Sequence, residues 1–214
     1  MKAPCACVVA LAEHGLVPSV QAARMTYAAS PEALHGAVAA GLPGAGSVIL
    51  GSSEDTAHLL ASIVAAAADG GGSGSGSGSI EACARTAVQE LRSTLSPVPG
   101  VGHPLHRERD PRAEALLAYA ESLGVRGPHT RALAAVVDVV PEIYGRRLAL
   151  NVSGAIPAVL LDAGFLPRAM KGIPLIGRTM SLVAHLLEEQ VAPIGFALAD
   201  AAEKEVDYSG PAPS

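Results

Sequence analysis

Apolar residues recur at the three- and four-residue spacing of helices along most of the chain, and no segment alternates apolar and polar positions as a half-buried strand does. The helices that this pattern predicts span residues 5–13, 19–29, 31–42, 54–68, 80–93, 111–123, 130–140, 156–163 and 173–187. Ser30 and Pro31 are typical of a helix cap and a first helical residue, and Pro141 is typical of a helix break. The pattern therefore predicts an all-α fold.

The composition supports this fold and argues against other classes. Of the 214 residues, 50% are hydrophobic and 16% are charged, so the chain is not disordered and can form a core without disulfides or metals. The net charge of −5, with 3% aromatic residues and no basic run, argues against nucleic-acid binding. No apolar run reaches the roughly 18–20 residues of a membrane span, so we expect no membrane partner.

Two further features concern cysteine and glycine. Cys5, Cys7 and Cys83 lack the spacing of a zinc site, so we predict no metal, reduced thiols and a cytoplasmic location. Residues 70–79 read GGGSGSGSGS. Such a tract behaves as a flexible coil, and it predicts a flexible loop between two helices.

The polar residues of this apolar chain gather in a few places. Residues 13–15, Glu-His-Gly, follow the first predicted helix. A glycine-rich loop, residues 99–102, leads to His103 and then to Asp-Pro-Arg at a helix start, residues 110–112. Backbone N–H groups and a guanidinium at a helix start can bind a carboxylate or a phosphate. The alternative is a capped helix with solvated charges.

Arg178 is a charge inside an apolar helical segment, Ile176–Met180. A buried charge is costly unless it is paired. Two interpretations stay open: an internal ion pair with Glu188 or Asp162, or an arginine that lines a cleft for an acidic ligand. Histidines without neighbouring polar chemistry are interpreted as structural, and these are His35, His58, His129 and His185.

Three sequence blocks together resemble the citrate synthase superfamily, and within it the short bacterial citryl-CoA lyases and the citryl-CoA lyase module of ATP-citrate lyase. They are LAEHGLVPSVQAARM at 11–25, GVGHPLHRERDPRAEALL at 100–117, and LNVSGAIPAVLLDAGFL at 150–166 running into IPLIGRTMSLVAHLLEEQ. The second block is the most specific. The resemblance covers most of residues 8–190.

The resemblance implies an all-α, citrate-synthase-like fold of two lobes that is short at its N-terminus. Residues 1–53 and 151–214 would form the large lobe, through which the chain would form a homodimer. Residues 54–150 would form the small lobe, with the flexible Gly/Ser loop 70–79 at its surface. The cleft between the lobes would hold a small carboxylic acid and a coenzyme A thioester, which is a substrate and not a bound cofactor.

Site residues follow from the matching positions. The resemblance implies that His14 contacts the carboxylic acid and that His103 holds its carbonyl or hydroxyl. Arg112 and Arg178 would clamp its carboxylates, which suits charge-assisted hydrogen bonding. Arg107 would lie near the coenzyme A phosphates.

One departure concerns the catalytic carboxylate. The family's aspartate lies in a segment written Asn-Val-Asp-Gly, and here residues 151–154 read Asn-Val-Ser-Gly, so Ser153 takes its place. A serine hydroxyl is a poor general base near neutral pH. The resemblance implies an enzyme that cleaves or forms a citryl-CoA-type thioester from acetyl-CoA and oxaloacetate, with His14, His103 and Ser153 at its catalytic centre. The alternative is a non-catalytic homologue that binds coenzyme A or a polycarboxylate.

Overall fold

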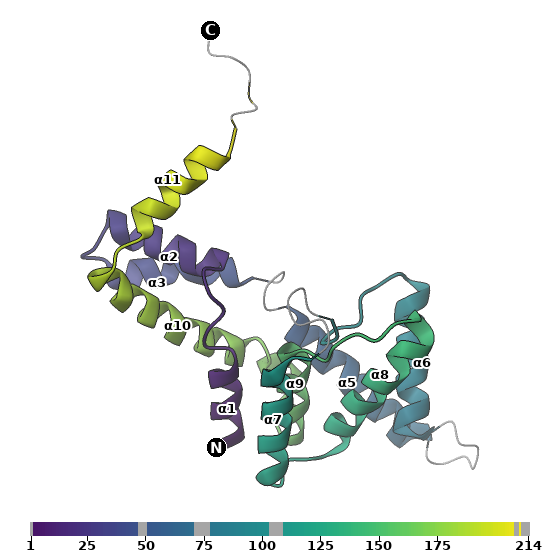
Figure 1. The fold of residues 1–214 in the computed structure, drawn as a ribbon. Helices are drawn as coiled ribbons and strands as arrows, with labels where there is room; N and C mark the ends of the chain where they lie inside the picture. Colours follow the sequence, from purple (N-terminus) through teal and green to yellow (C-terminus); the bar gives the residue numbers. More distant parts are fainter. Residues whose placement is uncertain (1, 47–50, 71–77, 103–108, 208–209, 211–214) are drawn as a thin grey trace. The chain divides into compact units, whose positions relative to one another are not determined.

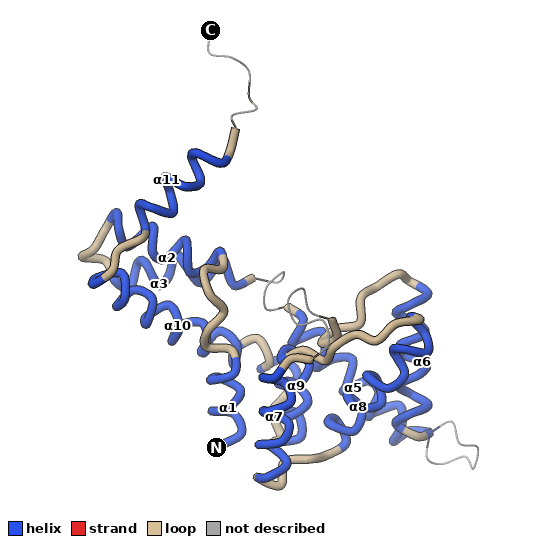
Figure 2. Tube along the Cα trace, viewed as in Figure 1, coloured by secondary structure: helices blue, strands red, loops and turns tan. Residues whose placement is uncertain are grey.

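The computed structural model describes residues 2–46, 51–70, 78–102, 109–207 and 210. These residues form helices and loops without a strand (Figure 1, Figure 2), and an isolated antiparallel bridge pairs Val101 with Leu150. The all-α prediction is confirmed. The elements are α1 (Lys2–Ala10), α2 (Pro18–Ala29), α3 (Leu34–Gly41), η1 (Leu42–Ala45), α5 (Ser52–Gly70), α6 (Ile80–Ser93), α7 (Pro111–Ser122), α8 (Pro128–Tyr144), α9 (Val152–Asp162), η3 (Pro167–Ala169), α10 (Gly172–Val191) and α11 (Gly195–Glu205).

Two predictions made from proline are wrong. Ser30 ends α2 instead of starting a helix, because its N–H donates to the carbonyls of Thr26 and Tyr27 at 3.0 and 3.2 Å. Pro141 lies inside α8, which ends only at Gly145 in a left-handed conformation, φ 69°. Four of the six residues from 135 to 140 of α8 are buried apolar side chains, and their packing outweighs the local cost of proline. The C-terminal helix α11 has no side-chain cap and was not predicted.

Contacts divide the chain into two compact units. The first comprises Met1–Leu11 and Ser47–Ile176, and the second comprises Ala12–Gly46 and Gly177–Ser214. The lobe boundaries implied by the resemblance, 54 and 150, stay a prediction. Most of the Gly/Ser loop, residues 71–77, lies outside the described residues. After the loop, the Ser79 hydroxyl caps the start of α6 by accepting from the Ala82 N–H at 3.1 Å.

Helix α9 is the centre of the first unit. Its sequence, VSGAIPAVLLD, is apolar on every face, and nine of its eleven residues are buried. A helix that is hydrophobic all round requires partners on all sides. Helices α1, α5, α7 and α8 supply them, and α6 packs on α5 and α8. The site residues at the start of α9 are therefore held on a rigid element.

The second unit is built on a close contact between α2, α3 and α10. Its core consists of small and branched apolar residues, namely Val20, Ala23, Ala37, Leu182 and Leu186. A Cβ at Gly41 would lie 2.6 Å from the Ser19 carbonyl oxygen and 2.9 Å from the Ala23 Cβ. Glycine is therefore required where α3 crosses α2. Helix α11 packs on α2.

Asp162, the last residue of α9, caps the start of α8. Its carboxylate accepts from the N–H groups of Gly127, His129 and Thr130 at 2.7, 2.9 and 2.9 Å, and from the Thr130 hydroxyl at 2.8 Å. Burial works to raise the pKa of Asp162, but these donors and His129 outweigh it and hold the pKa below its ordinary value. The ionised carboxylate therefore ties α9 to α8.

Replacing this carboxylate is expected to destabilise the fold in a pH-dependent way. Because the folded pKa is depressed, the ionised group contributes stability above its unfolded pKa, and the contribution is lost as pH falls through the folded value. Asp162→Asn should lower the free energy of unfolding by about 2 kcal/mol at pH 7. Chemical denaturation at pH 7 and below pH ~4 should show the difference shrinking, and Asp138→Asn, at an exposed position on α8, is the control. An equal loss at both pH values would contradict this role.

Candidate functional site

The predicted anion site at the start of α7 contains an internal counter-ion. Asp110 caps the helix, and its buried carboxylate accepts from the Arg112 backbone N–H at 3.0 Å. The Arg112 guanidinium donates to the same carboxylate through Nε and Nη2, at 3.0 and 2.9 Å. Burial works to raise the pKa of Asp110, and Arg112 and the N–H of Val152 outweigh it and lower the pKa. One edge of Arg112 is thus committed inside the protein, which leaves Nη1 for a ligand.

The same carboxylate connects α7 to the segment that carries Ser153. The Val152 N–H donates to Asp110 Oδ2 at 3.1 Å. Asn151 caps α9 by accepting from the Gly154 N–H at 3.1 Å. Ser153 therefore lies in the first turn of α9, where it is half-buried. Asp110 thus connects Arg112 to Val152, the residue before Ser153.

The glycine loop that precedes His103 lies against this turn. Gly102 N–H donates to the Ala149 carbonyl at 2.7 Å, and the Asn151 side-chain amide donates to the Gly102 carbonyl at 2.6 Å. Gly100 has φ 78°, and a Cβ on it would lie 2.6 Å from the Gly154 Cα. Glycine is therefore required at both Gly100 and Gly154, where the two backbones lie against each other. The two hydrogen bonds hold Gly102 against Ala149 and Asn151. His103 and Arg107 lie outside the described residues.

A polar cavity of about 770 Å³ adjoins this cluster. It lies between the start of α7, the last turns of α8 and the segment before Asn151. Its charged lining residues are Arg109, Asp110, Glu114, Asp138 and Arg147. Arg109 is paired with Glu114. The cavity is large enough for a ligand of ordinary cofactor size.

In the second unit, Arg178 is a buried charge without a hydrogen-bonding partner at two of its nitrogens. Only 1% of the residue is exposed, and its Nε and Nη1 have no partner among the residues that the structure describes. Burial lowers the pKa of Arg178, and the negative charge of Glu13 partly opposes this. Glu188 pairs with Arg24 and Asp162 caps α8, so neither forms the ion pair considered from the sequence.

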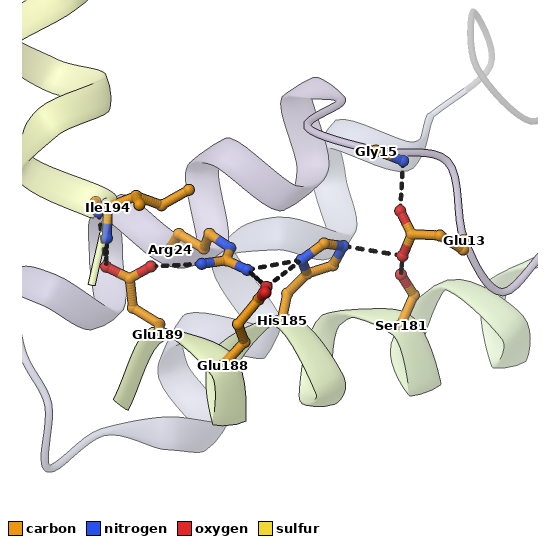
Figure 3. Close-up of polar contacts among 9 residues, drawn as sticks. Glu13, Gly15, Arg24, Ser181, His185, Glu188, Glu189 and Ile194 are labelled. Atoms are coloured by element: carbon orange, nitrogen blue, oxygen red, sulfur yellow. Dashed lines mark hydrogen bonds and ion pairs between the residues drawn. The ribbon is translucent and has the colours of Figure 1, made fainter. Parts of the chain in front are cut away.

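A chain of polar contacts links Glu13, His185 and Arg24 (Figure 3). Glu13 accepts from the Gly15 N–H, and its Oε2 lies 3.0 Å from His185 Nε2 and 3.5 Å from Ser181 Oγ. On the other side of the imidazole, Arg24 Nη2 lies 3.0 Å from His185 Nδ1. His185 was interpreted as structural from the sequence. It lies at the centre of this network.

The network continues to the start of α11. Arg24 Nη1 donates to Glu189 Oε2 at 2.8 Å, and the side chains of both residues are almost fully buried. Glu189 Oε1 then accepts from the N–H groups of Ile194 and Gly195 at 2.8 and 2.6 Å. The buried ion pair thus joins α2, α10 and α11. In the sequence, this ion pair is signalled by Glu188 and Glu189 at the end of an apolar helix. That pattern does not indicate that Arg24 is the partner.

The predicted site residues therefore fall into two groups. Arg112 and Ser153 lie in the first unit, and His14 and Arg178 lie in the second. Within the second unit, Glu13, which adjoins His14, contacts Ser181, one helical turn from Arg178. Convergence of all of these residues on one ligand stays a prediction. Among the described residues, no group of three or more His, Cys, Asp or Glu could hold a metal ion.

A family profile described as citrate synthase, C-terminal domain, matches residues 2–194. The chain belongs to the citrate synthase family.

Within the described residues no single helix is long and apolar enough to cross a membrane, although the bent pair Pro167–Val191 and Gly195–Glu205 passes by length and composition alone. A search of curated protein sequences gives no match.

Solved structures of citrate synthase family members and related lyases have the same fold. Citryl-CoA lyase from Hydrogenobacter thermophilus is 32% identical, with a TM-score of 0.82 over 98% of this chain and 76% of the lyase. ATP citrate lyase from Methanothrix soehngenii, solved with citrate and coenzyme A, is 20% identical, with a TM-score of 0.71 over 99% of this chain and 34% of that one. Citrate synthase from Thermotoga maritima is 19% identical, with a TM-score of 0.70 over 97% and 52%. The resemblance stated from the sequence is confirmed.

Proposed function

We propose that this citrate synthase family member is a carbon–carbon lyase that cleaves a citryl-CoA-type thioester to acetyl-CoA and oxaloacetate. The observation that carries the proposal is Arg178, a buried guanidinium with two unpartnered nitrogens among the described residues. A buried charge without a partner is retained at a cost, and a ligand carboxylate would supply the missing partner. The similarity to a citryl-CoA lyase over 98% of the chain supports the same substrate class.

The two arginines have different parts in binding. Arg178 would provide the main carboxylate contact because its hydrogen-bonding capacity is not used within the described protein. Arg112 would contribute through Nη1, since Asp110 already accepts from Nε and Nη2. The Asp110 pair also fixes the direction of the guanidinium, which favours binding by preorganisation. His14 and His103 would contact the hydroxyl that becomes the oxaloacetate carbonyl.

Cleavage requires two proton transfers and the rupture of one carbon–carbon bond. A base removes the proton from the citryl hydroxyl, the bond between the carbinol carbon and the α-carbon of the thioester breaks, and its electron pair forms the acetyl-CoA enolate. The proton then returns to the enolate carbon, so atoms and charge balance. His14 and His103 are the candidate bases. Ser153, at the first turn of α9, would hydrogen-bond the developing enolate oxygen.

Coenzyme A would bind through Arg107, as the resemblance implies. The cavity that adjoins the start of α7 supports this placement through Arg147, since Arg109 is already paired with Glu114. Guanidinium groups bind phosphate oxygens in bidentate fashion. Coenzyme A is a substrate here, and no resident cofactor is proposed.

We also propose a homodimer. One face of α10 carries four exposed apolar side chains at helical spacing, Met180, Val183, Leu187 and Val191. Such a stripe is typical of a face that is covered by another helix. Leu187→Glu should shift the chain from dimer to monomer in light scattering, because a charge would be buried at the contact. Gln89→Glu, at an exposed polar position of α6, should leave the dimer intact; a wild-type monomer would contradict the proposal.

The direction of the reaction is tested with acetyl-CoA and oxaloacetate. A lyase should form citryl-CoA to its equilibrium level and release little free coenzyme A, since thioester hydrolysis is a separate step. Free thiol and product masses are recorded over time. Stoichiometric release of free thiol would instead indicate a citrate synthase. Binding of both ligands without any product would favour the non-catalytic homologue.

A further inference from the structure

A protein carboxylate lies close enough to compete for Arg178. Glu13 contacts Ser181 and His185, which follow Arg178 by three and seven residues on α10. Residues at these spacings share one face of a helix. The Glu13 side chain is 63% exposed, so its rotamers are not fixed by packing. The negative charge of Glu13 already acts on the Arg178 guanidinium, which makes Glu13 a competitor for a ligand carboxylate there.

Contacts on three sides hold Glu13 in its observed position. The Gly15 N–H donates to Oε1, and Oε2 faces Ser181 Oγ and His185 Nε2 (Figure 3). The pKa of Glu13 is lowered: burial acts to raise it, and the Gly15 N–H, His185 and the His14 N–H outweigh that effect. The ionised form is therefore the one that these contacts favour.

The orientation of His185 is itself determined by the buried ion pair. An arginine only donates hydrogen bonds, so the 3.0 Å contact from Arg24 Nη2 requires His185 Nδ1 to accept. The ring proton then lies on Nε2, which faces Glu13. Arg24 is in turn fixed by Glu189 at 2.8 Å and by Glu188. The buried ion pair thus sets the tautomer of His185, whose Nε2 lies at ion-pair distance, 3.0 Å, from Glu13 Oε2.

We propose that His185, oriented by Arg24, is a positioning residue that holds Glu13 away from Arg178 and so keeps the guanidinium available to a ligand carboxylate. This inference rests on the proposed function, in which Arg178 binds that carboxylate. Without the His185 contact, Glu13 would pair with Arg178 and act as an internal competitor. The same contact fixes the Glu13–Gly15 turn, on which His14 lies.

The inference is tested by a double-mutant cycle with citrate as the probe, measured by calorimetry on the full chain. His185→Leu should weaken citrate binding about tenfold, because a charge pair forms at Arg178. Glu13→Gln should bind citrate at least as well as the wild type. The double variant His185→Leu/Glu13→Gln should recover the affinity of Glu13→Gln. Damage to the fold would not be rescued by removing a second contact, so a double variant as weak as His185→Leu would overturn the inference.

A second measurement does not depend on citrate. The Arg178 Nε–H resonance, identified by its loss in Arg178→Lys, should move on going from wild type to His185→Leu and return in the double variant. If His185→Leu folds poorly, Ser181→Ala takes its place. It removes a weaker contact to Glu13 and should therefore shift the resonance by a smaller amount. An unmoved resonance in both variants would overturn the inference even if citrate binds. A wild type that fails to bind citrate while the resonance moves as expected would contradict the proposed function alone.

Discussion

Arg178→Met is expected to weaken citrate binding by about 10- to 150-fold, the equivalent of the 1.5–3 kcal/mol that a hydrogen bond to a charged group contributes. The side chain is 1% exposed, and Nε and Nη1 have no partner among the described residues. In the proposed function its charge stabilises a bound anion and contributes little to stability within the chain. Methionine has a similar volume and removes a buried charge, so the free energy of unfolding should rise by about 1 kcal/mol or more. Calorimetry with citrate and chemical denaturation measure the two effects.

The opposite signs of these effects distinguish a binding residue from a structural one. A structural arginine would lose both stability and binding when replaced. Arg24 provides the matched comparison, because it is buried and paired with Glu188 and Glu189. Arg24→Met should destabilise the chain by about 3–5 kcal/mol, since it leaves the buried Glu189 unpaired. If Arg178→Met is destabilised to the same degree, Arg178 is part of the fold and the site is wrongly assigned.

Ser153→Asp is expected to raise citryl-CoA turnover by about 10²- to 10⁴-fold, the usual contribution of a positioned general acid–base group. Ser153 lies in the first turn of α9, where the helix dipole favours a carboxylate, so the substitution should be tolerated. The nearby Asp110 is already paired with Arg112, which limits repulsion. Steady-state kcat with citryl-CoA is the measurement.

Two controls separate the possible roles of position 153. Ser153→Ala should lower kcat only modestly if the hydroxyl hydrogen-bonds the enolate oxygen. Ser153→Asn has nearly the size of aspartate but cannot act as a base, and it should not raise kcat. A fall in kcat on introducing aspartate would show that the serine belongs to a different mechanism and is not a lost catalytic carboxylate.

The sequence predicted the helices well where apolar spacing and side-chain caps agree. Helix α6 begins and ends at the predicted residues, and Asp110 caps α7 as expected. Proline misled the prediction at Ser30 and Pro141, because tertiary packing decided both positions. The boundary of a helix depends on its neighbours as well as on its own residues.

The candidate site was predicted only in part, for a related reason. Arg178 could be singled out because a charge in an apolar helix is unusual in itself. The role of His185 could not be predicted, since its partners Glu13 and Arg24 are 172 and 161 residues away along the chain. The commitment of Arg112 to Asp110 could have been found, because a helix cap and an arginine two residues later are close in sequence.

The most direct test of the proposed activity is a reaction of the full chain with citryl-CoA, followed by mass spectrometry of all products. We predict that acetyl-CoA and oxaloacetate appear in equal amounts, and that Arg178→Met suppresses both. Recovery of intact citryl-CoA, or its conversion to citrate and free coenzyme A, would contradict the proposal that this citrate synthase family member is a citryl-CoA lyase.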